Sequence, residues 1–192
     1  IGLQYITQRS PEEIRELSKF KKPIFYDGKF FDIKNTLVES IKSLQTLNIT
    51  YATVHLLNGL EALKAANNIA QKINIKLLGV SILTSFEDED LLNLGFKDQI
   101  QNQVKRLIKI AIEANLYGVI CSPLEIKMIK EIEPRLKCFT PGIRINKNKN
   151  DQKRTMNANE AIKAGSDCLI IGRPITEGNP KQNIKEILLS ID

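Results

Sequence analysis

Asp27, Lys29 and Asp32 place three charges directly after the apolar run 23–25. Residues two apart on a strand point to the same side, so the side chains of Asp27 and Lys29 are expected to lie close together. A lysine ion-paired with carboxylates forms a preorganised field that can stabilise or protonate a carbanion. The pattern Asp-x-Lys-x-x-Asp therefore indicates acid–base chemistry at a carbon atom, although an ordinary salt bridge at a strand end gives the same pattern.

Short β-branched runs alternate along the chain with segments of helical period, which predicts parallel βα units. The predicted strands, read as buried on both faces, span 23–27, 51–57, 76–83, 117–121, 136–140 and 167–173. The predicted helices span 11–20, 36–47, 59–73, 100–114, 124–132, 158–164 and 181–190. Gly165 is expected to end the helix before the last strand.

Every predicted strand ends in polar, Gly- or Pro-containing residues, as the active-site face of a (β/α)₈ barrel requires. A doubly wound open sheet gives the same alternation, but it usually has a Gly-rich turn after its first strand, and none is present here. We therefore predict an α/β fold, a (β/α)₈ TIM barrel, formed by a single domain over residues 1–192. The polar tract 146–154 is expected to be a loop.

Composition limits the classes of partner. No apolar run approaches the roughly 20 residues that span a bilayer, so no membrane association is expected. The net charge of +6 comes from scattered lysines, and we expect no nucleic-acid binding. Cys121, Cys138 and Cys168 each lie in an apolar run, which predicts reduced thiols in the core of a cytoplasmic protein and no metal site.

Five motifs together carry a family resemblance. They are DGKFFDIKNT at 27–36, VH at 54–55, VSILTS at 80–85, TPGIR at 140–144 with DQ at 151–152, and IGRPIT at 171–176. In this order, and over essentially the whole chain, the sequence resembles orotidine 5′-phosphate decarboxylase of the bacterial type. The resemblance implies conversion of orotidine 5′-phosphate to UMP and CO₂ without a cofactor or a metal, by a homodimer with shared active sites.

The resemblance also implies roles for individual residues. Lys29 would donate the proton to the ring carbon that loses CO₂, Asp27 would lie against the departing carboxylate, and Asp32 would complete the catalytic set. Asp32 and Thr36 would act from the partner subunit. Further substrate-binding positions are implied at Ile33, Asn35, Thr84, Ser85, Arg144, Gln152, Gly172 and Arg173, with Thr84 and Ser85 by the pyrimidine and Gln152 and Arg173 at the phosphate. His55 is expected to be structural.

The sequence departs from the family pattern at several positions. The family has a strand with an aspartate, a helix and a second strand with a lysine, all before the pair that corresponds here to Ile1-Gly2, so the barrel is expected to be truncated at its N-terminus. Gly28, Phe31 and Lys34 stand where the family usually has an apolar residue, His and Pro. Two alternatives are an inactive homologue that acts as a binding or interaction protein, and a related sugar-phosphate barrel such as hexulose-phosphate synthase.

Overall fold

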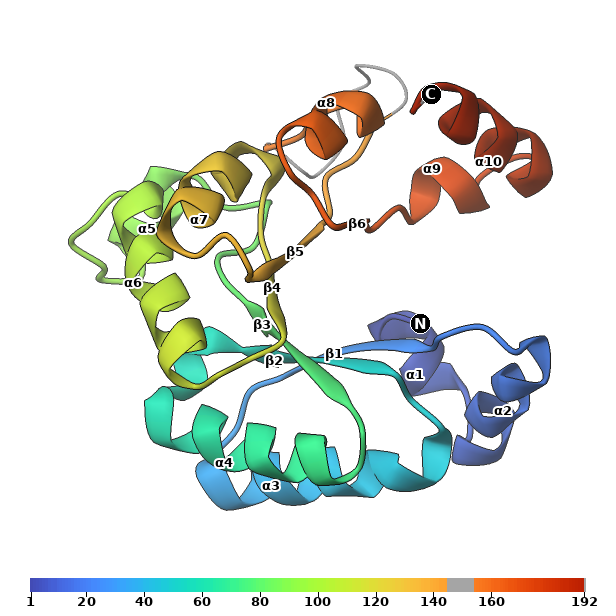
Figure 1. Ribbon diagram of the computed structural model, residues 1–192, viewed down its shortest axis with the longest axis horizontal. Coiled ribbons are helices and arrows are strands. Elements are labelled where there is room, and N and C mark those ends of the chain that lie inside the picture. Colours follow the sequence, from blue (N-terminus) through green and yellow to red (C-terminus); the bar gives the residue numbers. More distant parts are fainter. Residues whose placement is uncertain (145–153, 192) are drawn as a thin grey trace. The chain divides into compact units, whose positions relative to one another are not determined.

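The computed structural model describes residues 1–144 and 154–191. Its chain divides into two compact units, which are described separately below. Unit 1 comprises Ile1–Ser81 and Lys109–Gly118, and unit 2 comprises Ile82–Ile108 and Val119–Asp192. Strands and helices alternate along the sequence in both units, as Figure 1 shows. The single domain over 1–192 stays a prediction.

The strands of unit 1 are β1 (Phe25–Phe30), β2 (Tyr51–His55) and β3 (Lys76–Val80). β2 pairs in parallel with both neighbours, with Tyr51 opposite Phe25 on β1 and opposite Lys76 on β3. The register of β1 shifts between Tyr26 and Phe30. The pair Ile1-Gly2 continues the pairing on the other edge of β1, because Asp27 N–H donates to Ile1 O at 2.9 Å.

Helices alternate with the strands of unit 1, and the longer ones have a buried apolar face. The helices are α1 (Leu3–Gln8), α2 (Pro11–Glu16), α3 (Lys34–Ser43) and α4 (Leu60–Lys72), with 3₁₀ turns η1 (Leu17–Phe20), η2 (Leu44–Leu47) and η3 (Leu56–Asn58). The buried residues of α3 and α4 recur at helical spacing and include Leu37, Ile41 and Leu63. Burying one face of each helix against the sheet holds the loop between β1 and α3 in place.

The strands of unit 2 are β4 (Gly118–Ile120), whose first residue belongs to unit 1, β5 (Lys137–Thr140) and β6 (Cys168–Leu169). β5 and β6 pair in parallel, with Phe139 opposite Cys168. The helices are α5 (Asp88–Asn93), α6 (Ile100–Glu113), α7 (Ile126–Ile132), α8 (Ala158–Lys163), α9 (Arg173–Thr176) and α10 (Pro180–Leu189), with the 3₁₀ turn η4 (Pro123–Glu125). The end of α6, from Lys109, belongs to unit 1.

The predicted elements are all present, but β6 differs from its prediction in length and burial. It ends at Leu169, before the backbone turns at Gly172, whose ψ of −102° is not extended. Cys168 on β6 is exposed, so the prediction that all three cysteines lie in the core is wrong for this residue. β6 is the last strand in the described sheet, where its only strand partner is β5. Gly165 ends α8 with a φ of +105°, as predicted.

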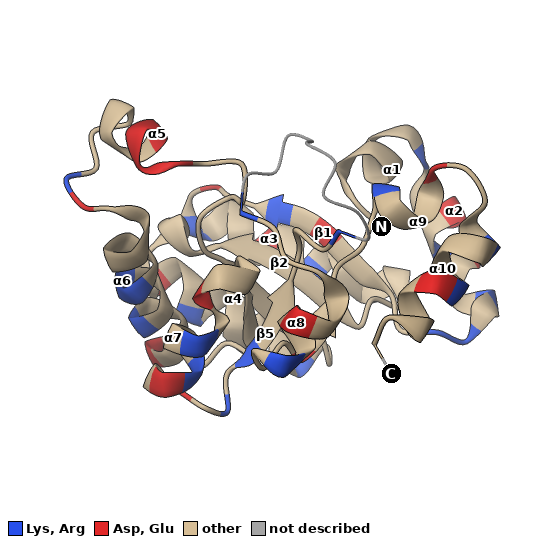
Figure 2. Cartoon of the chain, turned by 90° about the horizontal axis from the view of Figure 1, so that it is seen from above, with Lys and Arg blue, Asp and Glu red and all other residues tan. Residues whose placement is uncertain are grey.

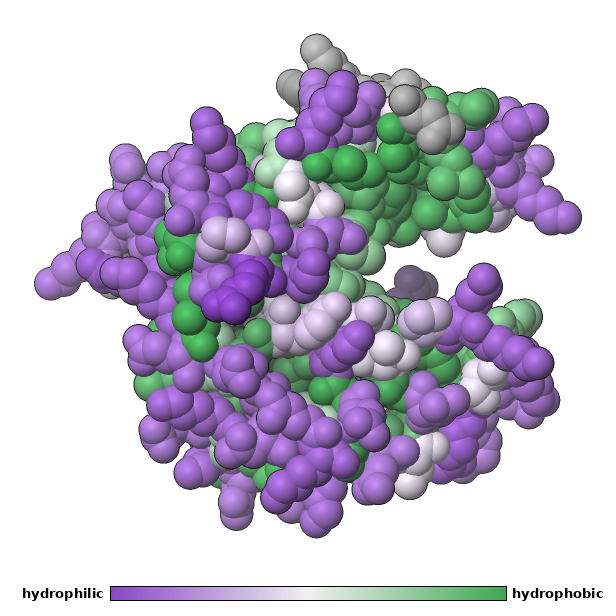
Figure 3. All heavy atoms as spheres, viewed as in Figure 1, coloured by the Kyte–Doolittle hydropathy of each residue, from purple (hydrophilic) through white to green (hydrophobic). Residues whose placement is uncertain are grey.

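Apolar residues from α8, α10 and the strand ends form the core of the C-terminal part of unit 2. Ile143, Ala158, Ala161 and Ile187 are buried together, and Leu169 packs against them. Figure 3 shows hydrophobic residues gathered over the region of β6 and α9 on the visible face. Lysines and acidic residues instead mix on helices such as α7, as Figure 2 shows. Among the described residues, no helix has the length and apolar character that crossing a membrane requires.

Candidate active site

β1 brings Asp27 and Lys29 into direct contact, as the sequence predicted. Lys29 Nζ donates to Asp27 Oδ2 at 2.5 Å, and the two side chains are 32% and 20% exposed. The regular pleat assumed in the prediction is absent, because Lys29 has a φ of +46° at the point where the register of β1 shifts. Non-glycine residues seldom adopt this left-handed conformation, and such residues gather at functional sites.

A fully buried threonine on β2 holds this conformation. Thr53 Oγ1 accepts the Lys29 N–H at 2.8 Å and donates to Asp27 Oδ1 at 2.9 Å. One hydroxyl therefore fixes both the backbone of the lysine and the carboxylate of its partner. The one sequence signal for Thr53 is that it is a polar residue inside the apolar run of β2, and the predicted site does not include it.

Gly28 between the two charged residues makes room for aromatic packing. The rings of Tyr26 and Phe30 stack with centroids 5.8 Å apart. A Cβ at Gly28 would lie 2.9 Å from Tyr26 Cε1, closer than side chains tolerate. Glycine at this position therefore lets the two aromatic rings stack along the strand.

Asp32 lies beyond the strand in the loop that leads to α3, and its side chain is exposed. Its Oδ1 accepts the Ile33 N–H at 2.7 Å, and among the described residues no hydrogen bond or ion pair joins it to Lys29. Asn58 anchors the loop, because it accepts the Asp32 N–H at 3.0 Å and donates to Phe30 O at 2.9 Å and to His55 O at 2.7 Å. No local pattern in the sequence indicates this role of Asn58.

The other predicted residues of unit 1 lie at the start of α3. Ile33, Asn35 and Thr36 are all exposed, and Ile33 is 74% exposed. Asn35 and Thr36 line an open hollow on the surface of α3 together with Glu39, Ser40 and Ser43. Exposed positions of this kind are available to a second chain.

His55 at the end of β2 packs against Phe31, with ring centroids 5.6 Å apart. Burial lowers the pKa of His55, and the Lys29 ammonium lowers it further. His55 Nδ1 accepts the Leu57 N–H at 3.4 Å, a contact that suits a neutral imidazole. These contacts agree with a structural role for the histidine.

The remaining predicted residues belong to unit 2. Thr84 is buried and Ser85 is exposed in the segment after β3. Arg144 N–H donates to Met156 O at 3.0 Å, and Met156 N–H donates to Gly142 O at 3.1 Å. Gly142 has a φ of +80°, and a Cβ there would lie 2.9 Å from Arg154 O, so this turn requires glycine.

Gly172 and Arg173 follow β6, and both are exposed. Gly172 O accepts the Ile175 N–H at 2.8 Å, which begins the single turn of α9 at Arg173. Gln152 lies outside the described residues. The structure thus brings Asp27 and Lys29 together within unit 1, and it places Thr84, Arg144 and Arg173 on segments that follow strands in unit 2.

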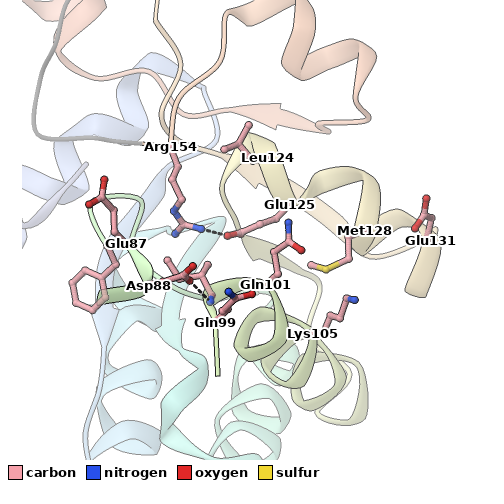
Figure 4. Close-up of a pocket in the computed structure, with 12 residues that line it drawn as sticks. Glu87, Asp88, Gln99, Gln101, Lys105, Leu124, Glu125, Met128, Glu131 and Arg154 are labelled. Carbon is pink, nitrogen blue, oxygen red and sulfur yellow. Dashed lines mark hydrogen bonds and ion pairs between the residues drawn. The ribbon is translucent and has the colours of Figure 1, made fainter. Parts of the chain in front are cut away.

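A more deeply buried charge pair lies in unit 2, where the sequence predicted none. Glu125 is 3% exposed and pairs with the Arg154 guanidinium (Figure 4). Glu125 also accepts the Ser122 N–H at 3.0 Å. Burial raises the pKa of Glu125, while Arg154 and the Ser122 N–H oppose that shift. The pair borders a cavity of about 610 Å³ lined also by residues of α5, α6 and α7.

Among residues 1–144 and 154–191, no group of three or more His, Cys, Asp or Glu side chains could hold a metal ion. The contact between Lys29 and Asp27 offers proton transfer and charge stabilisation.

Comparisons with known proteins match the whole chain. A sequence model of the family described as "Orotidine 5'-phosphate decarboxylase / HUMPS family" matches residues 1–187. The chain is 41% identical over 193 residues to the orotidine 5'-phosphate decarboxylase of Wolbachia pipientis subsp. Culex pipiens (strain wPip), covering 100% of this chain and 85% of the relative. It is 38% identical over 195 residues to the enzyme of that name from Ehrlichia chaffeensis (strain ATCC CRL-10679 / Arkansas), covering 100% and 84%.

Solved structures show the same fold. The orotidine 5'-phosphate decarboxylase of Lactobacillus acidophilus superposes with a TM-score of 0.86 at 32% identity, over 100% of this chain and 85% of that one. The orotidine 5'-monophosphate decarboxylase of Sulfolobus solfataricus gives a TM-score of 0.78 at 19% identity, over 99% and 84%, which supports the fold alone. The prediction of a TIM barrel over a doubly wound sheet is confirmed, and the described residues contain six of its strands.

Proposed function

Because the chain belongs to the orotidine 5'-phosphate decarboxylase / HUMPS family, we propose that it converts orotidine 5′-phosphate to UMP and CO₂, the last step of de novo pyrimidine synthesis. This makes it a carboxy-lyase. The observation that carries the proposal is the Asp27–Lys29 pair, which Thr53 holds in place. It occurs in a chain that matches a protein named orotidine 5'-phosphate decarboxylase over its full length.

The reaction assigns a step to each of the paired side chains. The bond between the pyrimidine ring and its carboxylate breaks, CO₂ leaves, and the electron pair remains on the ring carbon. Lys29 Nζ gives a proton to that carbon, and solvent later returns the proton to the lysine. A general acid must lie within hydrogen-bond reach of the atom it protonates, and the contact with Asp27 fixes Nζ in position. Asp27 would lie against the departing carboxylate.

Substrate binding is proposed for the segments after the strands. Thr84 and Ser85 would contact the pyrimidine, while Arg144, Gln152, Gly172 and Arg173 would bind the rest of the nucleotide. Gln152 and Arg173 would hold the phosphate, because a guanidinium offers paired donors to a dianion. Ile33 and Asn35 are further proposed contacts.

A homodimer would complete the site. Asp32 and Thr36 are exposed at the start of α3, which fits a role across a subunit interface. The described cysteines are free thiols, which fits the reducing cytoplasm that we propose as the location. The aspartate and lysine predicted upstream of Ile1 lie outside this sequence and stay a prediction.

The direct test is turnover by the intact protein. We expect UMP formation from orotidine 5′-phosphate, and we expect Lys29→Met to lower kcat by roughly 10²–10⁴-fold, the usual contribution of a general acid. Lys42→Met on the exposed face of α3 is the matched control and should retain activity. An intact wild-type protein that neither binds UMP nor releases CO₂ would refute the proposal and favour an inactive binding protein.

A further inference from the structure

Arg154 connects three segments of unit 2 that are distant in sequence. Its Nη2 donates to Ile82 O at 3.1 Å and to Leu83 O at 3.0 Å, and its Nη1 pairs with Glu125 after β4. Its backbone N–H donates to Thr84 O at 3.4 Å. The guanidinium therefore binds the stretch that immediately precedes Thr84 and Ser85.

Burial gives this connection its strength. The side chains of Arg154 and Glu125 are 12% and 3% exposed, and Figure 4 shows them pointing toward each other. A buried ion pair is costly to break, because the partner that remains is an uncompensated charge. The carboxylate of Glu125 also accepts the Ser122 N–H. The partner of the guanidinium is therefore itself held in place.

The guanidinium reaches its acceptors from two nitrogens, Nη2 toward the carbonyl oxygens of Ile82 and Leu83 and Nη1 toward Glu125. A lysine at this position would have to replace this planar fork with one nitrogen. Resting on the proposed function, we infer that Arg154 is a positioning residue for substrate: its guanidinium holds the segment 82–85 so that Thr84 and Ser85 meet the pyrimidine.

The backbone near Arg154 is held independently of its guanidinium. Met156 forms main-chain hydrogen bonds with Gly142 and Arg144 at 3.1 and 3.0 Å, and Ser122 Oγ donates to Arg154 O at 3.5 Å. Loss of the side chain therefore removes the contacts to Ile82 O and Leu83 O, while the main-chain contact to Thr84 O and the turn at Gly142 remain. This loss should weaken the contacts that Thr84 and Ser85 make with the pyrimidine of the ligand.

The test compares two ligands in the intact protein. We expect Arg154→Met to weaken UMP binding by roughly tenfold or more, because small displacements of binding groups are costly, and to change ribose 5-phosphate binding less than about twofold. Arg154→Lys and Glu125→Gln should fall between this variant and wild type. Arg106→Met removes an exposed, ion-paired arginine of unit 2 and should leave both affinities unchanged.

Hydrogen exchange provides a readout that does not depend on ligand. Without nucleotide, peptides spanning 82–86 should exchange faster in Arg154→Met and in Arg154→Lys than in wild type and in Arg106→Met. If Arg154→Met does not fold, Arg154→Lys and Glu125→Gln are compared with wild type in the same way.

Two results in the variants overturn the inference by showing a purely structural arginine. One is an equal loss of UMP and ribose 5-phosphate affinity, and the other is a lower melting temperature with UMP affinity unchanged, since both describe an arginine that only stabilises the fold. Wild-type protein that binds no UMP would instead overturn the proposed function, and this inference with it. Wild-type binding together with unchanged binding in all three variants overturns the inference alone.

Discussion

The Thr53 hydroxyl is the only group on β2 that touches both members of the Asp27–Lys29 pair through hydrogen bonds in the described structure. The threonine is fully buried, so replacing its hydroxyl with a methyl group leaves two polar partners unsatisfied. The residue therefore links the stability of unit 1 to the geometry of the proposed proton donor.

Thr53→Val keeps the volume of the side chain and removes both hydrogen bonds. We expect the free energy of unfolding to fall by about 1–3 kcal/mol, the cost of unsatisfied buried groups. We expect kcat to fall while KM changes little, because the Lys29 backbone loses the partner that holds its left-handed conformation. Denaturant unfolding and steady-state kinetics measure the two effects.

Thr53→Ser is the control, because it keeps the hydroxyl and loses only a methyl group. It should retain most of the wild-type kcat despite a small loss of stability. Equal kcat values for the Ser and Val variants would show that the hydroxyl does not position the lysine.

Asp167 connects α7, β5 and the turn before β6. Lys130 Nζ donates to Asp167 Oδ2 at 2.7 Å, Lys137 Nζ donates to Oδ1 at 2.8 Å, and the Cys138 N–H donates to Oδ2 at 2.9 Å. Desolvation on its own would raise the pKa of Asp167, but these three hydrogen bonds outweigh it and lower the pKa. Folding therefore favours the ionised carboxylate.

This shift fixes the sign of the pH dependence. Because the pKa is lowered on folding, the stability that Asp167 contributes is complete above the unfolded-state pKa of about 4 and is lost as the pH falls through the lower folded-state value. Asp167→Asn should reduce the free energy of unfolding at pH 7 by about 1–3 kcal/mol. The difference from wild type should shrink below pH about 4, which urea unfolding at several pH values measures.

Glu39→Gln removes one partner of the exposed ion pair with Lys42 on α3 and serves as the control. Its cost should stay below about 1 kcal/mol at pH 7, as for surface pairs in general. If Asp167→Asn cost the same amount at pH 3 as at pH 7, the carboxylate charge would not be the source of its effect.

Across the chain, the local sequence pattern is sufficient to predict a helix or strand wherever that element buries a strong apolar face. β2 and α4 lie within one or two residues of their predicted bounds, because their side chains repeat at strand and helix periods. α1 and α5 were not predicted, since each has six residues and α1 buries none of them. Such helices depend on the structure around them rather than on their own periodicity.

The candidate site was predictable only where its chemistry is local in sequence. The Asp27–Lys29 contact follows from two-residue spacing, whereas Thr53, Asn58 and Arg154 act on residues 24 to 72 positions away. Their roles depend on which segments become neighbours on folding, and a single sequence does not give that information. The resemblance to a family identified the proposed substrate-binding positions but not the residues that hold them.

A homodimer with shared sites makes a quantitative prediction at the scale of the assembly. Lys29→Met and Asp32→Asn should each inactivate the pure homodimer, because one removes the proton donor and the other removes the proposed contribution of the partner. In an equal mixture that exchanges subunits, half of the dimers are mixed. Each mixed dimer has one site with both residues intact, so activity should recover to about one quarter of wild type.

Assays before and after subunit exchange measure this recovery. A mixture of Lys29→Met with Asp27→Asn is the control and should recover no activity, because both residues lie on β1. Absence of recovery in the first mixture would place Asp32 in the same subunit as the lysine it serves.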